Sequence, residues 1–221
     1  MFKKILPLLI ILLVLLTSCN FLTGATITNQ QDLAQDNLHL ENLECSKIQN
    51  QQIRDSCVAE LATTKQDLAV CDLIQDQKTK SYCQEQIAEL TNDSDLCGQI
   101  DDRYWRDNCH FHLATTNNQD DLCHFIFTPE QKQTCFKEIA IATNNAELCE
   151  FLTLNNREAC LSKIAHATLD IQYCQLLDNS INRDACRFKI AKLSGNSQPC
   201  ELIGNDIIKQ DCFAYFAEQS E

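Results

Sequence analysis

The chain has 221 residues and a formal net charge of −13, with 15 cysteines but only four glycines and three prolines. A chain this acidic repels nucleic acid and anionic lipid headgroups, and we therefore expect no nucleic-acid partner. Glycine and proline are the residues that most oppose helix formation, and their scarcity favours an all-α fold.

The first 18 residues have the features of an export signal. Lys3 and Lys4 precede the apolar run 5–16, which is too short to be read first as a membrane-spanning helix. The run ends in Leu16-Thr17-Ser18-Cys19, which resembles the lipobox of prokaryotic lipoproteins. The resemblance implies cleavage before Cys19 and lipid attachment to its sulfur; the alternative is an ordinary signal peptide or an uncleaved anchor with a chance cysteine.

Export and lipidation would place the protein on the outer face of a prokaryotic membrane, in the periplasm or at the cell surface. A diacylglyceryl group carries two chains, which is enough for stable anchoring. Residues 19–42 are polar and show no strong periodicity, so we predict a lipidated N-terminus and flexible tether there. Residues 43–221 form the third predicted segment, a repeat domain.

The cysteines of the repeat domain recur with a fixed period. Their spacing alternates between 12 and 14 residues, with one step of 11, which makes seven units of 26 residues. Such a period is typical of stacked repeats. The fourteen positions are Cys45, Cys57, Cys71, Cys83, Cys97, Cys109, Cys123, Cys135, Cys149, Cys160, Cys174, Cys186, Cys200 and Cys212.

Each repeat is predicted to be a short helix, a turn and a longer helix. We number each repeat from its first cysteine, which is position 1, so that the second cysteine is position 13. The fifth repeat is one residue shorter between its cysteines, and we place the gap in the turn so that the later positions keep their numbers. Position 4 is aliphatic and position 18 is alanine in every repeat, which indicates one buried face. The long helix should run from about position 7 to 20, after an N-cap at position 6. These caps are Asn50, Asp76, Asp102, Thr128, Thr153, Asn179 and Asn205.

The short helix should open at a second cap and end near position 5. The residues in this second group are Asp67, Asp93, Asn145, Asp170 and Asn196, with Gln119 the weak case. Antiparallel packing about the turn would bring positions 1 and 13 together. We therefore favour disulfides within repeats over bridges between repeats such as Cys57–Cys71, which would leave Cys45 and Cys212 unpaired. Small helical units need such cross-links because they bury little core.

No metal or cofactor site is expected. Zinc and iron–sulfur sites use cysteines two to four residues apart, and the chain has no such pair. His110, His112 and His124 are interpreted as surface histidines, since residues two apart on a helix point to different faces. No catalytic motif is visible, so we do not expect an enzyme.

Two groups of side chains allow both a structural and a functional interpretation. Position 10 is basic throughout and could either bind its own turn or grip an anionic polymer. We call this set the basic ladder: Arg54, Lys80, Arg106, Lys132, Arg157, Arg183 and Lys209. The aromatic residues Tyr104, Trp105, Phe111 and Phe188 could contact a partner or pack locally.

Helix-turn-helix units with one cysteine on each helix resemble the cysteine-rich, tetratricopeptide-like repeat proteins secreted by some bacteria. The resemblance implies a right-handed α/α solenoid of seven disulfide-linked repeats that binds other molecules along one face. We therefore expect a protein-binding or scaffolding module whose partner is a protein or an envelope polymer. Two alternatives stay open: a weak hydrolase that binds β-lactams, as the family resemblance implies, and a structural envelope protein without a ligand.

Overall fold

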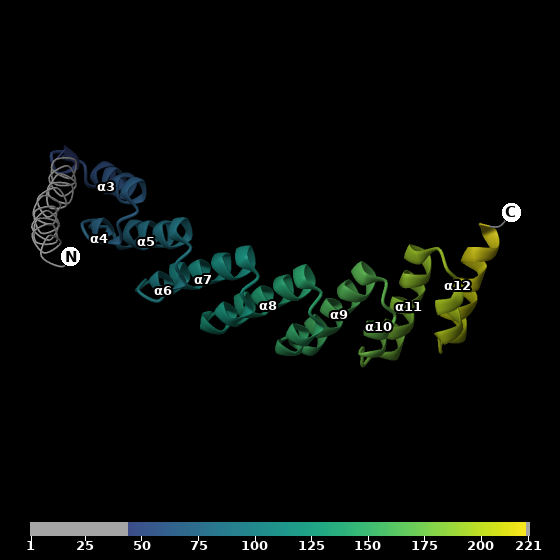
Figure 1. The fold of residues 1–221 in the computed structure, drawn as a ribbon. Coiled ribbons are helices and arrows are strands. Elements are labelled where there is room, and N and C mark those ends of the chain that lie inside the picture. Colours follow the sequence, from purple (N-terminus) through teal and green to yellow (C-terminus); the bar gives the residue numbers. More distant parts are fainter. Residues whose placement is uncertain (1–43, 220–221) are drawn as a thin grey trace, which may run out of the picture. The chain divides into compact units, whose positions relative to one another are not determined.

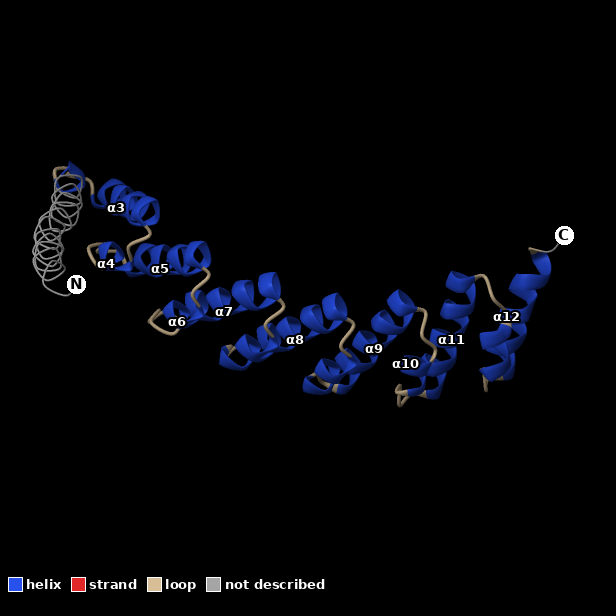
Figure 2. Cartoon of the chain, in the orientation of Figure 1, coloured by secondary structure: helices blue, strands red, loops and turns tan. Residues whose placement is uncertain are grey.

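The computed structural model describes residues 44–219, which are helices joined by turns, with no strand in that range (Figures 1 and 2). The predicted signal segment 1–18, the tether and Cys19 lie outside the described residues. The chain divides into a first unit up to Lys80 and a second from Ser81 onward. The predicted fold class is confirmed: the described chain is a disulfide-linked helical repeat solenoid.

Within the described residues of the first unit, one long helix and one short helix follow the helical residues 44–46. They are α3 (Gln51–Lys65) and α4 (Leu68–Cys71). The helix α5 (Gln77–Thr91) begins in this unit and ends in the second.

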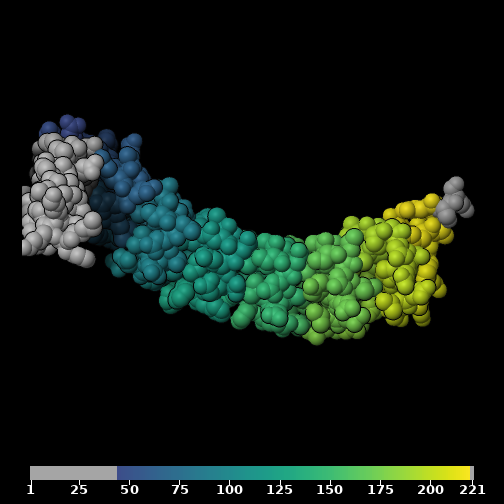
Figure 3. Space-filling view, in the orientation of Figure 1, coloured from purple at the N-terminus to yellow at the C-terminus, as the bar shows by residue number. Residues whose placement is uncertain are grey.

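The second unit repeats the same short–long alternation. Its long helices are α7 (Arg103–Asn117), α8 (Pro129–Thr143), α9 (Leu154–Thr168), α11 (Ser180–Ser194) and α12 (Asp206–Glu218). Its short helices are α6 (Ser94–Cys97), η1 (Asp120–Phe125), η2 (Ala146–Phe151), α10 (Gln172–Gln175) and η3 (Gln198–Leu202). Within this unit the long helices stack in sequence order, each beside the next (Figures 1 and 2). The colours of the surface follow the same order from teal to yellow (Figure 3).

The long helices confirm the prediction, whereas the short helices are shorter than expected. Each long helix begins at position 7, and all but α12 end at position 21. The short helices end at positions 1–3 rather than near position 5, and η1, η2 and η3 are 3₁₀ rather than α. Segments of four to six residues can form few i→i+4 hydrogen bonds, so a tight 3₁₀ turn is the common outcome.

Five of the seven predicted N-caps at position 6 bond as expected. The side chain of Asn50, for example, accepts the N–H of Ile53 at 3.1 Å, and Asp102, Asn179 and Asn205 cap their helices in the same way. Asp76 accepts the N–H of Thr79.

The prediction is wrong for the two threonines. The hydroxyls of Thr128 and Thr153 instead donate to Asp107 and Gln133 of the preceding repeat. In the second group, every predicted cap except Gln119 accepts a backbone N–H with its side chain. These caps are Asp67, Asp93, Asn145, Asp170 and Asn196.

The predicted core positions are buried. From Ile74 to Ile203 the position-4 side chains are at most 8% exposed, and the alanines from Ala62 to Ala191 are fully buried. Alanine lets neighbouring long helices approach closely, which joins repeats into one continuous cluster from Ala88 to Ile190. Ala191, Cys200, Ile203 and Cys212 form a separate, smaller core under the last repeat.

Disulfides join the two helices within a repeat, as predicted. The Cα atoms of each bridged pair are 5.5–5.9 Å apart, within the normal range. The bridges are Cys45–Cys57, Cys97–Cys109, Cys123–Cys135, Cys149–Cys160, Cys174–Cys186 and Cys200–Cys212. Cys71 and Cys83 are also disulfide-bonded.

Candidate functional site

The basic ladder binds the turns of the repeats. Lys132 Nζ donates to the carbonyl oxygen of His124 at 2.9 Å, and Arg183 Nη2 donates to that of Leu177 at 2.8 Å. Five of the seven ladder residues bond a carbonyl of their own short helix or turn in this way, and they are Arg54, Arg106, Lys132, Arg183 and Lys209. Lys80 pairs with Asp72 and Arg157 with Glu150, each at 2.8 Å. The structural interpretation of the basic ladder therefore holds.

A second set of polar side chains holds each turn from the preceding repeat. At position 11, a side-chain oxygen accepts the backbone N–H at position 6 of the next repeat, and the three aspartates also accept the N–H at position 5. These side chains are buried, except that Gln133 is half-buried. Asp107 Oδ1 accepts from Phe127 N and its Oδ2 from Thr128 N, both at 2.9 Å. We call this set the acceptor ladder: Asp55, Asp107, Gln133, Glu158 and Asp184.

The hydrogen bonds keep two of these carboxyl groups ionised. Burial raises the pKa of Asp107, but bonds from Phe127 and Thr128 outweigh it, and the pKa lies below its usual value. The N–H of Asn179 likewise lowers the pKa of Glu158, with further help from the Asn182 amide. Sequence analysis missed the acceptor ladder, although the recurrence of a polar residue at position 11 was a signal for it.

The exposed apolar side chains gather where these two ladders act. We define the turn edge as positions 3–9, which comprise the turn and the start of the long helix. Of fourteen large apolar side chains exposed in the second unit, only Tyr82, Leu90, Leu169, Leu193 and Phe213 lie elsewhere. The other nine lie on the turn edge: Tyr104, Phe125, Phe127, Phe151, Leu154, Leu176, Ile181, Leu202 and Ile207.

Position 3 forms an apolar row through four consecutive repeats. Phe125, Phe151, Leu176 and Leu202 are 47–56% exposed. Two of them stack on position 14 of the preceding repeat: Phe151 lies 4.5 Å from Phe136, and Phe125 lies 5.4 Å from His110, measured between ring centroids. These aromatic rings are thus held in place while half of each side chain stays open to solvent.

The four predicted partner-contact residues fall into two kinds of environment. Tyr104 is 64% exposed, and its ring meets Trp105 edge-on at 5.1 Å. Trp105 is partly buried between Tyr104 and Tyr82 and packs against the core. Phe111 and Phe188 are also partly buried against cores, and Lys192 lies over the Phe188 ring at 4.1 Å. Tyr104 fits a contact site, whereas Trp105, Phe111 and Phe188 fit local packing.

The expectation of surface histidines is wrong for His110. It is 5% exposed because Phe125 covers it, and burial lowers its pKa. His112 and His124 are exposed, and His110 and His112 do point to different faces. The sequence could not show that Phe125 of the next repeat folds over His110.

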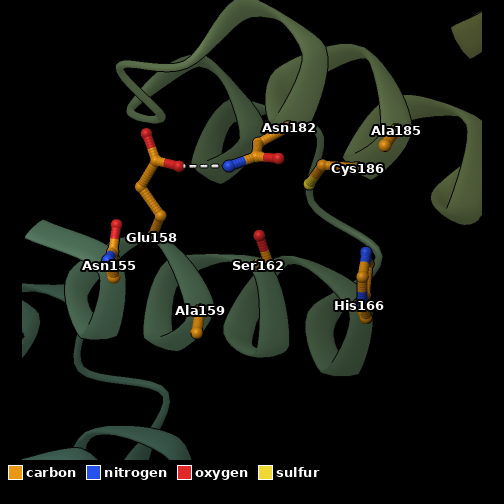
Figure 4. Close-up of a pocket in the computed structure, with 8 residues that line it drawn as sticks. All are labelled: Asn155, Glu158, Ala159, Ser162, His166, Asn182, Ala185 and Cys186. Atoms are coloured by element: carbon orange, nitrogen blue, oxygen red, sulfur yellow. Dashed lines mark hydrogen bonds between the residues drawn. The ribbon is translucent and has the colours of Figure 1, made fainter.

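The groove between α9 and α11 brings together residue types that occur in hydrolases. It has a volume of about 400 Å³, and Glu158, Ser162 and His166 line it from α9 (Figure 4). The Glu158 carboxylate accepts hydrogen bonds from Asn179 and Asn182 of the next repeat. His166 Nε2 is buried without a hydrogen-bond partner. The contacts that activate a serine are therefore missing from this groove.

Comparison with protein-family models, curated proteins and solved structures finds no match for this chain. None of the helices within residues 44–219 has the length and apolar character needed to cross a membrane. The seven disulfide-linked pairs indicate an oxidising, extracytoplasmic environment.

Proposed function

We propose that this chain is an exported, lipid-anchored solenoid whose turn edge binds a protein partner. The observation that carries the proposal is the apolar row at position 3, which recurs through four repeats instead of being scattered. Apolar patches of this kind on a soluble surface are typical of interaction sites. The basic ladder and the acceptor ladder hold this edge rigid, which reduces the entropy that binding costs.

The charges beside the row indicate the chemistry of the partner. Glu201 and Asp206 are exposed on or next to the turn edge of the last repeat, and in the two repeats before it Glu150 and Asp178 share the single cation of Arg157, so the edge stays negative. They complement a partner segment in which apolar side chains are flanked by lysine or arginine. We therefore expect a basic, amphipathic protein segment as ligand, and binding that weakens as salt concentration rises.

Site-specific photo-cross-linking tests the proposed surface. A photoreactive phenylalanine analogue is placed at Phe151 or, as a matched control, at Leu193, which is similarly exposed but lies outside the turn edge. In cells of the source organism, Phe151 should capture a defined protein that Leu193 does not. The captured protein is then purified, and Phe151→Ser should weaken its binding at least tenfold while Leu193→Ser leaves it unchanged. Equal capture at both positions would contradict the proposal.

The lipid anchor is tested separately. Cys19 follows the lipobox-like residues and lies outside the described part of the chain. The Cys19→Ser variant should move from the membrane fraction to the soluble extracytoplasmic fraction, because the acyl chains supply the membrane affinity. If the variant stays on the membrane and the wild type carries no acyl chain, the anchor assignment is wrong while the turn edge is unaffected.

A further inference from the structure

Three metal-binding side chains meet between α5 and α7, away from the turn edge. Glu85 and Glu89 are one helical turn apart on α5, and His112 projects from α7. One carboxylate oxygen of each glutamate and one imidazole nitrogen lie within 4.8 Å of one another. Residues at i and i+4 share a helix face, so both carboxylates point to the same neighbour.

Glu85 is the unusual member of this group. Glu85 is only 3% exposed, yet within the described residues its carboxylate has neither a hydrogen-bond donor nor a basic partner. A buried carboxylate without a partner is costly, and a bound cation would remove that cost.

We propose that Glu85, Glu89 and His112 bind one divalent transition-metal ion of the Zn²⁺ type. Imidazole together with carboxylate is a donor set that such ions accept, whereas Ca²⁺ and Mg²⁺ take oxygen ligands. Metal–ligand bonds of about 2.0–2.2 Å require the three donor atoms to approach by roughly an ångström, which side-chain rotation can supply. Three protein ligands leave a fourth position for water.

The chain has a built-in reporter next to this site. Trp105 is its only tryptophan, and it precedes His112 by seven residues, or about 10 Å, along α7. Its ring contacts Tyr82, which lies three residues before Glu85 on α5, with the ring centroids 5.3 Å apart. A Co²⁺ ion bound by the three ligands should therefore quench Trp105 fluorescence.

Calorimetric titration of the full chain with Zn²⁺ tests the site. The protein is kept oxidised in detergent, stripped with a chelator and checked for the absence of free thiols, since reduced cysteines would bind the ion. We expect one Zn²⁺ per chain, with affinity at least tenfold lower in His112→Ala and in Glu89→Gln. The matched control is His124→Ala, an exposed histidine outside the cluster, which should bind as the wild type does.

The Trp105 signal separates the proposed site from binding elsewhere. Co²⁺ should quench fluorescence in the wild type and in His124→Ala but not in His112→Ala, with circular dichroism confirming that each variant is folded. The variants of the half-buried Glu89 and the exposed His112 make this test independent of Glu85, whose replacement could disturb the packing. A wild type that binds no stoichiometric Zn²⁺, or a His112→Ala variant that binds and quenches normally, would overturn the proposal.

Discussion

Leu169 is the residue that departs most clearly from the pattern of its repeat position. It ends α9 with a φ of 56°, in the left-handed region that disfavours branched side chains. The same position holds Asn92, Asn118 and Asn144 in three other repeats, Gly195 in the sixth and Gln66 in the first. Asparagine and glycine tolerate this conformation, so leucine is a local conflict between sequence and fold.

Leu169→Asn should therefore stabilise the protein. Leu169 is 45% exposed, so its replacement loses little apolar burial while the backbone strain falls. We expect a gain of about 0.5–1 kcal/mol in the free energy of unfolding, measured by urea denaturation with the disulfides intact. The control is Leu193→Asn, the same change within the right-handed part of α11, which should not stabilise. A gain in both variants would point to a general surface effect instead.

Single residues were predictable from the sequence where their role is local. Asn50 and Asp102 cap their helices as expected because a cap needs only its own first turn. Thr128 does not, because Asp107 of the preceding repeat competes for its hydroxyl. The surface position expected for His110 is wrong for the same reason, because Phe125 of the next repeat stacks on its ring. Contacts between repeats therefore cannot be predicted from the residue pattern within one repeat.

At the scale of the helices, Asp107 links α7 to the start of α8. Its carboxylate accepts the N–H groups of Phe127 and Thr128 and lies 3.9 Å from Arg103 Nε. The long helices were predictable because their caps and apolar faces repeat. The acceptor ladder was not, because aspartate, glutamine and glutamate share position 11 in a chain where acidic residues are common. Apart from Tyr104 and Trp105, the turn edge was also missed, since exposure depends on how neighbouring repeats pack.

Asp107→Asn should destabilise the protein in a pH-dependent way. The native pKa of Asp107 lies below its unfolded value of 3.8. Its contribution is thus complete above about pH 4 and is lost as the pH falls through the native pKa. At pH 6 we expect a loss of about 1–2 kcal/mol in the free energy of unfolding. At pH 3 the difference from the wild type should shrink.

Urea denaturation at the two pH values measures this effect. The control is Asp121→Asn, the same chemical change at an exposed position on η1. It should leave the stability difference small at both pH values. A destabilisation by Asp107→Asn that is equally large at pH 3 and pH 6 would show that the lost acceptor oxygen, rather than the charge, matters.

At the scale of the whole described chain, stability should be distributed repeat by repeat. The period and the cysteine pairing were predictable because every unit carries them, and solenoid repeats contact mainly their neighbours. The sequence does not show how unevenly the buried core residues are distributed among the repeats. The main cluster of the second unit runs from Ala88 to Ile190, whereas the last repeat is built on a separate cluster of four buried residues.

The last repeat should therefore unfold locally before the other repeats do, and Asp184 should control how often this happens. Asp184 Oδ2 accepts the N–H groups of Gly204 and Asn205 and so joins α11 to the start of α12. In Asp184→Ala, amide hydrogen exchange should speed up at least tenfold in α12 and change little in α8, because the coupling is lost only at one interface. The control is Asp178→Ala, an exposed acidic residue in the preceding turn. Equal acceleration in α8 and α12 would mean that the repeats open as one cooperative unit, against the nearest-neighbour architecture.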